Sequence, residues 1–152
     1  MQVIQEIESA RERLQISPND FYQIPPQKGR EVFQKSLEAF VKSGHRRWWW
    51  EDFRQEAFEF QPQKRPFEMV SQLIPPDAEK VWFIAEDTEE PFFPVYRVRP
   101  ELISAVIGEC FGFEYYVVDL NFRWLLCETH HHRLLGVGDL LKNYNDERII
   151  KE

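Results

Sequence analysis

Residues 114–139 constrain the fold of this chain more than any other segment. They read EYYVVDLNFRWLLCETHHHRLLGVGD, so that three short apolar runs are separated by two polar breaks. Short apolar runs bounded by turn-forming residues are typical of buried β-strands. We therefore expect three strands joined by two tight turns. The strands are predicted at 114–119, 123–128 and 132–137, with the turns at 120–121 and at the histidine triplet 130–132.

The first half of the chain shows helical periodicity instead. Apolar residues recur at steps of three and four, with polar residues between them, which is typical of amphipathic helices. The aromatic segment HRRWWWEDFRQEAFEF at 45–60 fits a short strand or turn that enters a helix near Glu51. Two further strands are expected at 81–87 and 92–99. The predicted helices are 2–15, about 30–43, 67–74, a segment that starts at Pro100, and a short one that starts near Gly138.

This order of elements predicts an α+β fold, with N-terminal helices packed on a mainly antiparallel sheet of about five strands. A chain of 152 residues is long enough for one hydrophobic core, so we expect a single globular domain over 1–152. Within it, residues 1–75 are helix-rich, 76–145 are sheet-rich, and the polar tail 146–152 is expected to fray. Trp124 opens a central strand and is expected to be buried between the sheet and a helix.

The composition limits the classes of partner. The chain has 26 acidic and 19 basic residues, which gives a formal net charge of −7. Nucleic-acid binding depends on clustered Lys and Arg, so we expect no nucleic acid as the main partner and favour a basic protein. No apolar run reaches the length of a membrane span, and the N-terminal segment lacks the apolar core of a secretory signal. We therefore expect a cytoplasmic protein, a monomer or homodimer, with Cys110 and Cys127 as reduced, packed thiols.

An acidic segment is the first candidate for contact with a basic partner. Four carboxylates lie together at the end of one predicted strand and in the loop after it: Glu86, Asp87, Glu89 and Glu90. Clustered carboxylates speed association with a basic protein and add selectivity. The simpler interpretation is a solvated loop without a ligand. Asp119 and Glu128, at the ends of adjacent strands, are expected to extend the same acidic edge.

The histidine triplet is the second candidate. In an extended turn, His130 and His132 project to one side and His131 to the other. Two imidazoles at this spacing can bind a divalent metal when further ligands are present, and Glu128 is the candidate for a third. The usual zinc motifs are absent from the sequence, so we expect no metal and no other cofactor. The remaining alternatives are a solvent-facing turn and a contact surface for a partner, and we include all three histidines in the predicted contact surface.

The sequence has none of the common catalytic motifs. The patterns GxSxG, Walker A and GxGxxG are all missing. Cys127 lies in an apolar strand, which suits packing more than nucleophilic attack. A carboxylate pair can supply general acid and base catalysis, but only where a pocket raises the pKa of one member. The tryptophan run 48–50, preceded by two arginines, is expected to supply core residues and an anchor for a partner.

The segments YYVVD, WLLCETHHH and LLGVGD, together with RRWWWEDF, resemble an uncharacterised bacterial domain family of small, acidic, cytosolic proteins. In size, acidity and aromatic content the chain is also similar to α+β immunity proteins of bacterial toxin systems, including the SUKH group. Those proteins bind and block a cognate toxin. The resemblance implies a non-enzymatic binding protein that neutralises a basic toxin domain. The alternative is a small metal-binding protein or hydrolase-like enzyme that uses the 130–132 histidine turn.

Overall fold

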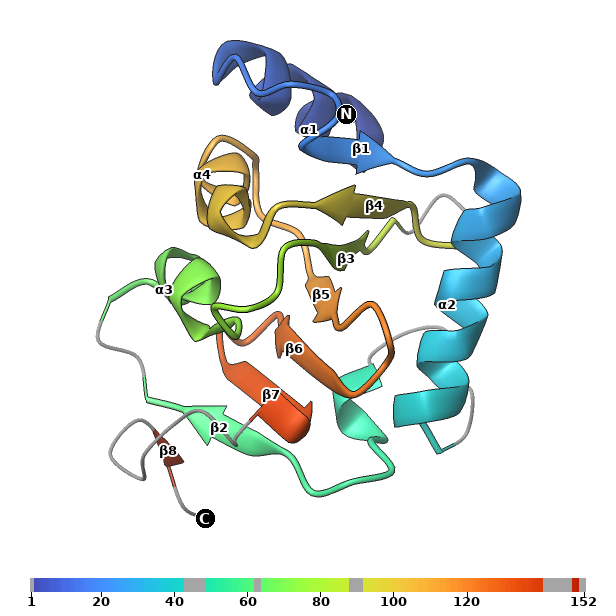
Figure 1. Cartoon of the computed structure of the whole chain (residues 1–152). Helices are drawn as coiled ribbons and strands as arrows, with labels where there is room; N and C mark the ends of the chain where they lie inside the picture. The colour runs from blue at the N-terminus through green and yellow to red at the C-terminus, as the bar shows by residue number, and fades with distance from the viewer. Residues whose placement is uncertain (1, 43–48, 62–63, 88–91, 141–148, 151–152) are drawn as a thin grey trace.

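The computed structural model describes residues 2–42, 49–61, 64–87, 92–140 and 149–150. Within these residues the chain forms helices and strands that alternate along the sequence (Figure 1). In chain order they are α1 (Val3–Arg13), β1 (Phe21–Gln23), α2 (Pro26–Phe40), η1 (Trp49–Glu51), β2 (Phe58–Phe60), α3 (Pro66–Leu73), β3 (Val81–Ala85), β4 (Val95–Val98), η2 (Pro100–Leu102), α4 (Ile103–Gly108), β5 (Tyr115–Val118), β6 (Trp124–Glu128), β7 (Leu134–Gly138) and β8 (Ile149–Ile150), where η marks a 3₁₀ helix.

All of these strands join one antiparallel sheet, in the spatial order β1-β4-β3-β5-β6-β7-β2-β8. The expected class, helices with a mainly antiparallel sheet, is confirmed, but the expected number of about five strands was wrong. Among the described residues the sheet has eight strands, and the additional ones, β1, β2 and β8, are only two or three residues long. The tail was also expected to fray, yet Ile149 and Ile150 pair with β2.

The central strands are buried on both faces. Successive side chains of a strand point to opposite faces, and in β3 both sets are apolar. Phe83 packs into a core that includes residues of α1, α3 and α4, whereas Ile84 packs into a second core that includes residues of α2. The sheet therefore separates two hydrophobic cores, and helical segments cover each core on the side away from the sheet.

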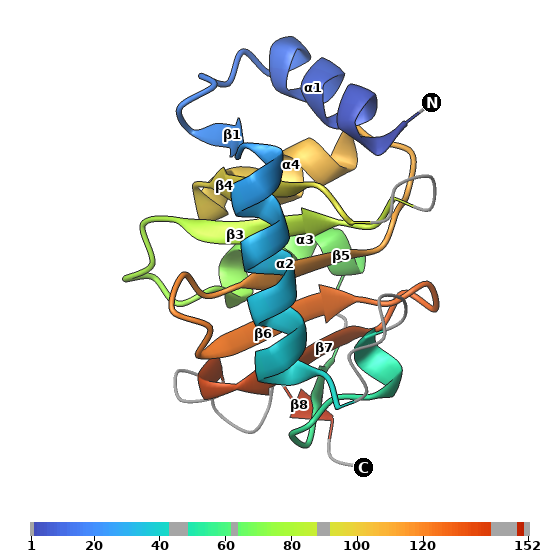
Figure 2. The same ribbon diagram turned by 90° about the vertical axis from the view of Figure 1, so that its right-hand side faces the viewer.

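The helices cover the two faces unequally. Helix α2 runs alone across the strands on one face, and α1, α3 and α4 cover the other (Figure 2). The prediction of N-terminal helices followed by the sheet was wrong in part, because strands β1 and β2 lie among the first three helices; α4, between β4 and β5, is the helix expected from Pro100. Among the described residues no helix combines the length and the apolar character needed to cross a membrane.

Two helix predictions in the first half need correction. Helix α2 begins at Pro26, earlier than the expected start near residue 30, because a proline without an N–H fits the first turn of a helix. Residues 51–61 contain no α-helix, although one was expected to begin near Glu51. The chain makes the single 3₁₀ turn η1 there and then enters strand β2. Residues 43–48, which include the first tryptophan of the run, lie outside the described residues.

The three strands expected between 114 and 139 are confirmed to within two residues at each end. Trp124 is 4% exposed and packs in the core beneath α3 and α4, as predicted. Gly138 ends β7 with a φ of 78°, and a Cβ at this position would lie 2.3 Å from the carbonyl oxygen of Arg123. The short helix expected to follow Gly138 lies largely outside the described residues.

Candidate functional site

A groove of about 1150 Å³ lies at the end of the sheet where β3 and β6 finish and β5 begins. Antiparallel pairing brings these strand ends together, because Ala85 pairs with Tyr115 and Tyr115 pairs with Glu128. Helices α1, α3 and α4 supply the apolar part of the lining, with Val3, Phe67 and Ile107. The polar part includes five carboxylates and two imidazoles: Glu6, Glu86, Asp87, Glu114, Glu128, His130 and His132.

The groove gathers residues from both candidates of the sequence analysis. Glu86 and Asp87 line it together with His130 and His132. Glu86 and Asp87 are only 9% and 4% exposed. The simpler interpretation of the sequence, a solvated loop, therefore does not hold for these two residues. Residues 88–91, which contain the predicted contacts Glu89 and Glu90, lie outside the described residues.

Glu86 and Glu114 form a carboxyl pair across two strands. They follow directly on the pair Ala85–Tyr115, and the Glu86 N–H donates to the Glu114 carbonyl oxygen at 2.9 Å. Their side chains are hydrogen-bonded to each other. This contact is one of the causes that lower the pKa of Glu114.

Glu114 also joins two other segments through one oxygen. Its Oε1 accepts the indole N–H of Trp50 at 3.3 Å and the backbone N–H of His130 at 2.8 Å, and it lies 2.9 Å from Nδ1 of the His130 ring. Burial raises the pKa of Glu114, but the hydrogen bonds with Glu86 and His130 and the charge of His130 outweigh it. The pKa of Glu114 consequently lies below its ordinary value.

The histidine triplet is a compact turn and not an extended strand. Thr129 accepts the N–H of His132 on its carbonyl oxygen and that of His131 on its hydroxyl. His132 has a φ of 60°, a left-handed conformation that reverses the chain. The rings of His130 and His131 lie 5.1 and 5.8 Å from that of Trp50. The turn is not extended, so the expected alternation of His130 and His132 against His131 does not apply as stated, although His130 and His132 do line the same groove.

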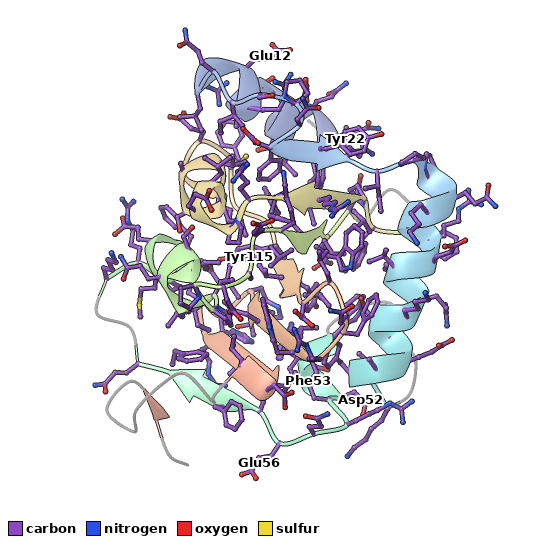
Figure 3. The ribbon with its side chains drawn as sticks, in the orientation of Figure 1. Glu12, Tyr22, Asp52, Phe53, Glu56 and Tyr115 are labelled. Atoms are coloured by element: carbon purple, nitrogen blue, oxygen red, sulfur yellow. The ribbon has the colours of Figure 1, made fainter. Side chains whose placement is uncertain are left out.

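Glu128 also lines the groove and has its own partners. The hydroxyl of Tyr115 donates to Oε1 of Glu128 at 2.7 Å, and Nδ1 of His132 lies 3.3 Å from Oε2. Tyr115 is fully buried in the interior of the molecule (Figure 3). Burial, followed by the negative charge of Glu128, raises the pKa of Tyr115 well above its ordinary value. The phenol therefore stays protonated and fixes the Glu128 carboxylate.

The histidine rings face different carboxylates, Glu114 for His130 and Glu128 for His132. Among the described residues no group of three or more His, Cys, Asp and Glu side chains is placed to hold a metal ion. Burial raises the pKa of the Cys110 thiol to about 11 and that of Cys127 further still. Both thiols therefore stay protonated near neutral pH and do not supply a thiolate nucleophile.

Asp119 does not extend the acidic edge, contrary to the sequence prediction. In an antiparallel hairpin the last residues of two successive strands lie at opposite ends, so Asp119 is remote from Glu128. Asp119 lines a second hollow of about 530 Å³, where its carboxylate accepts from Nε of Arg123 at 3.0 Å. That hollow also contains Lys80 and Arg97, so its charge is mixed.

Sequence reasoning missed Glu114 and Glu6 as groove residues. Glu114 was read as the first residue of a strand, and its role appears only when that strand is paired with β3. Glu6 was read as part of the polar face of the first helix, whereas its Oε1 accepts the N–H of Phe111 at 2.7 Å. The strand pattern gave no signal for Glu114, because the positions of both parities in that strand are apolar.

The fold and the groove define a small α+β protein with an acidic, partly aromatic cleft at one end of an antiparallel sheet. Residues 1–148 match a family of unknown function, DUF6756, and the chain belongs to that family. The expected membership in an uncharacterised domain family is thus confirmed, while the likeness to SUKH immunity proteins stays a prediction. No curated protein and no solved structure matches the chain.

Proposed function

We propose that this chain is a non-enzymatic binding protein that holds a basic partner protein against the acidic groove. One observation carries the proposal: five carboxylates from α1 and from the ends of three strands line a single groove. Arg65 is the one Lys or Arg among the described residues of the lining, and it pairs with Glu68. The groove is therefore complementary to positive charge.

Because these carboxylates are partly buried, they contribute to specific recognition of the partner and not only to its long-range electrostatic attraction. Glu86 and Asp87 are buried, and the side chain of Glu128 is 13% exposed. Charges in such partly desolvated positions are screened less by salt than charges on an open surface. A basic partner that fits the groove gains both attraction and selectivity, because a wrong partner would leave these groups desolvated without a counter-charge.

A basic toxin domain is the class of partner that this proposal favours. An immunity protein acts by occupying a surface of the toxin, so it needs a complementary face and no catalytic group. The net charge of −7, the acidic groove and the protonated state of both thiols support this role. A basic partner of another kind would use the same groove.

Affinity measurements on charge variants test the proposal. The partner is first captured with the tagged chain and purified, and Kd is then measured by calorimetry at about 50 and about 300 mM salt. We expect Glu6→Lys and Glu128→Gln to weaken binding at least tenfold at the lower salt concentration. The matched control is Glu38→Lys, because Glu38 is exposed on α2, across the sheet from the helices that line the groove.

The outcome of the control decides the interpretation. If Glu38→Lys weakens binding as much as Glu6→Lys, only the net charge matters and the groove is not the binding site. If no variant changes Kd, the proposal of an acidic binding surface is wrong. Circular dichroism and thermal unfolding of each variant exclude loss of the fold as the cause.

A further inference from the structure

We propose that the groove receives an extended, arginine-bearing segment of the partner, with the guanidinium on the groove carboxylates and an apolar neighbour on Phe111. This inference rests on the proposed function and specifies its ligand. Three independent features carry it: the size of the groove, the chemistry of its lining, and an exposed aromatic ring at its rim. Each of them limits the kind of segment that fits.

The size of the groove favours a peptide segment over a small molecule. Its volume of about 1150 Å³ exceeds the range of roughly 300–1,000 Å³ that is usual for small-ligand pockets. It is lined from α1, α3, α4 and three strands, so it runs along the end of the sheet. Several consecutive residues in an extended conformation fill such a space.

The residues that line the groove favour arginine over lysine as the ligand. The carboxylates of Glu86, Glu114 and Glu128 lie at the ends of three different strands. A guanidinium has five N–H donors, so it can donate hydrogen bonds to more than one of these carboxylates. Phe67 and Phe113 add aromatic rings to the lining. A guanidinium already lies over one of these rings, since Cζ of Arg65 is 5.1 Å from the centre of the Phe67 ring. Lysine offers a compact charge and lacks the planar group that stacks on such rings.

Phe111 marks the rim of the groove. It is 79% exposed and is the most exposed large apolar side chain among the described residues. Its neighbours Cys110 and Gly112 both line the groove, and its backbone is held by the hydrogen bond to Glu6. An exposed aromatic ring on an anchored backbone, beside a partly desolvated charged groove, is the arrangement of an anchor at a protein interface.

Gly112 offers a way to fill the groove without disturbing the fold. A Cβ at this position meets no atom within 4 Å, and its backbone is not in the left-handed region. Gly112→Leu therefore adds bulk to the lining and leaves every carboxylate in place. Gly112→Ala is the matched control, because it changes the backbone preference in the same way but adds only one methyl group.

The test uses a library of blocked heptapeptides with one fixed central residue and mixed residues elsewhere. Pools with arginine, lysine, citrulline or leucine at the centre are titrated into the isotopically labelled protein, and amide shifts give the site and the affinity. We expect the arginine pool to bind at least tenfold more tightly than the citrulline pool, with shifts at residues 110–114 and 128–132. Gly112→Leu and Phe111→Ser each reduce this affinity at least tenfold, and Gly112→Ala leaves it within twofold.

Failure of the inference is distinguishable from failure of the proposed function. If arginine and citrulline pools bind equally, or the shifts fall outside the groove, the arginine-segment inference is overturned. The proposed function still stands if the purified partner protein loses affinity with Glu6→Lys and Glu128→Gln. If the partner protein is insensitive to those variants and to Gly112→Leu, both proposals are overturned.

Discussion

Glu114 connects three parts of the chain that are far apart in sequence. Its side chain is 9% exposed and accepts hydrogen bonds from Trp50 and from the backbone of His130, besides the carboxyl pair with Glu86. Hydrogen bonds to a charged group contribute about 1.5–3 kcal/mol each to stability. We expect Glu114→Ala to lower the free energy of unfolding by about 2 kcal/mol, measured by urea denaturation at pH 7.

The pH dependence of this loss follows from the sign of the pKa shift. The pKa of Glu114 is lowered from its ordinary value of 4.5, so the unfolded chain binds the proton more readily than the folded chain. Its stabilising contribution is therefore present above pH 4.5 and disappears as the pH falls through the lower, folded-state value. The difference in unfolding free energy between the native chain and Glu114→Gln should shrink over that range. A constant difference down to pH 3 would contradict the assignment.

Trp124 tests the packing of the first hydrophobic core. It is buried under α3 and α4 at the start of β6. Removal of a fully packed aromatic side chain costs on the order of 3–5 kcal/mol, through lost burial and the cavity that remains. We expect Trp124→Ala to cost that amount in urea unfolding, whereas Tyr22→Ala, at a position 47% exposed, should cost less than about 1 kcal/mol.

Prediction from sequence succeeded where the pairing of strands is local. Strands β5, β6 and β7 are joined by short turns, so their apolar alternation and their turn residues determine both their extent and their register. Strands β1, β2 and β8 are too short to show a period, and they pair with distant segments. These residues form strands only because they pair with distant segments, and such tertiary contacts cannot be read from a single sequence.

The candidate site shows the same division. Proximity of Glu128 to the histidine turn is a local property of one hairpin and was foreseen. Proximity of Glu86 to Glu114 requires β3 to pair with β5 across the intervening β4 and α4, which sequence spacing cannot reveal. Burial of Asp87 likewise depends on helices that arrive from elsewhere in the chain.

The end of β7 depends on a single glycine. Gly138 adopts a φ of 78°, and a Cβ at this position would lie only 2.3 Å from the carbonyl oxygen of Arg123. A side chain here is excluded by both the backbone conformation and this contact. We expect Gly138→Ala to lower the free energy of unfolding by more than about 2 kcal/mol. Gly112→Ala, where space is open, serves as control and should change stability little; equal effects of the two substitutions would contradict this account.

At the scale of the whole molecule, the sheet divides the chain into two cores of different construction. One core is closed by one α-helix, α2, together with Trp49 and Phe53, and the other by α1, α3 and α4. The groove opens on the side of the three helices, where gaps between α1, α3 and α4 meet the strand ends. A continuous single helix offers no such gap, which explains why the groove lies on the composite face.

The first and last strands of the sequence, β1 and β8, lie at opposite edges of the sheet. A pulling force applied to the two ends of the chain therefore acts across the strands and loads their hydrogen bonds one row at a time. The sheet should open like a zipper from its edges, at low force and in several steps, and not by simultaneous sliding of whole strands. In an optical trap we expect β8 or β1 to detach first, while β5 and β6, which lie inside the sheet, give way last.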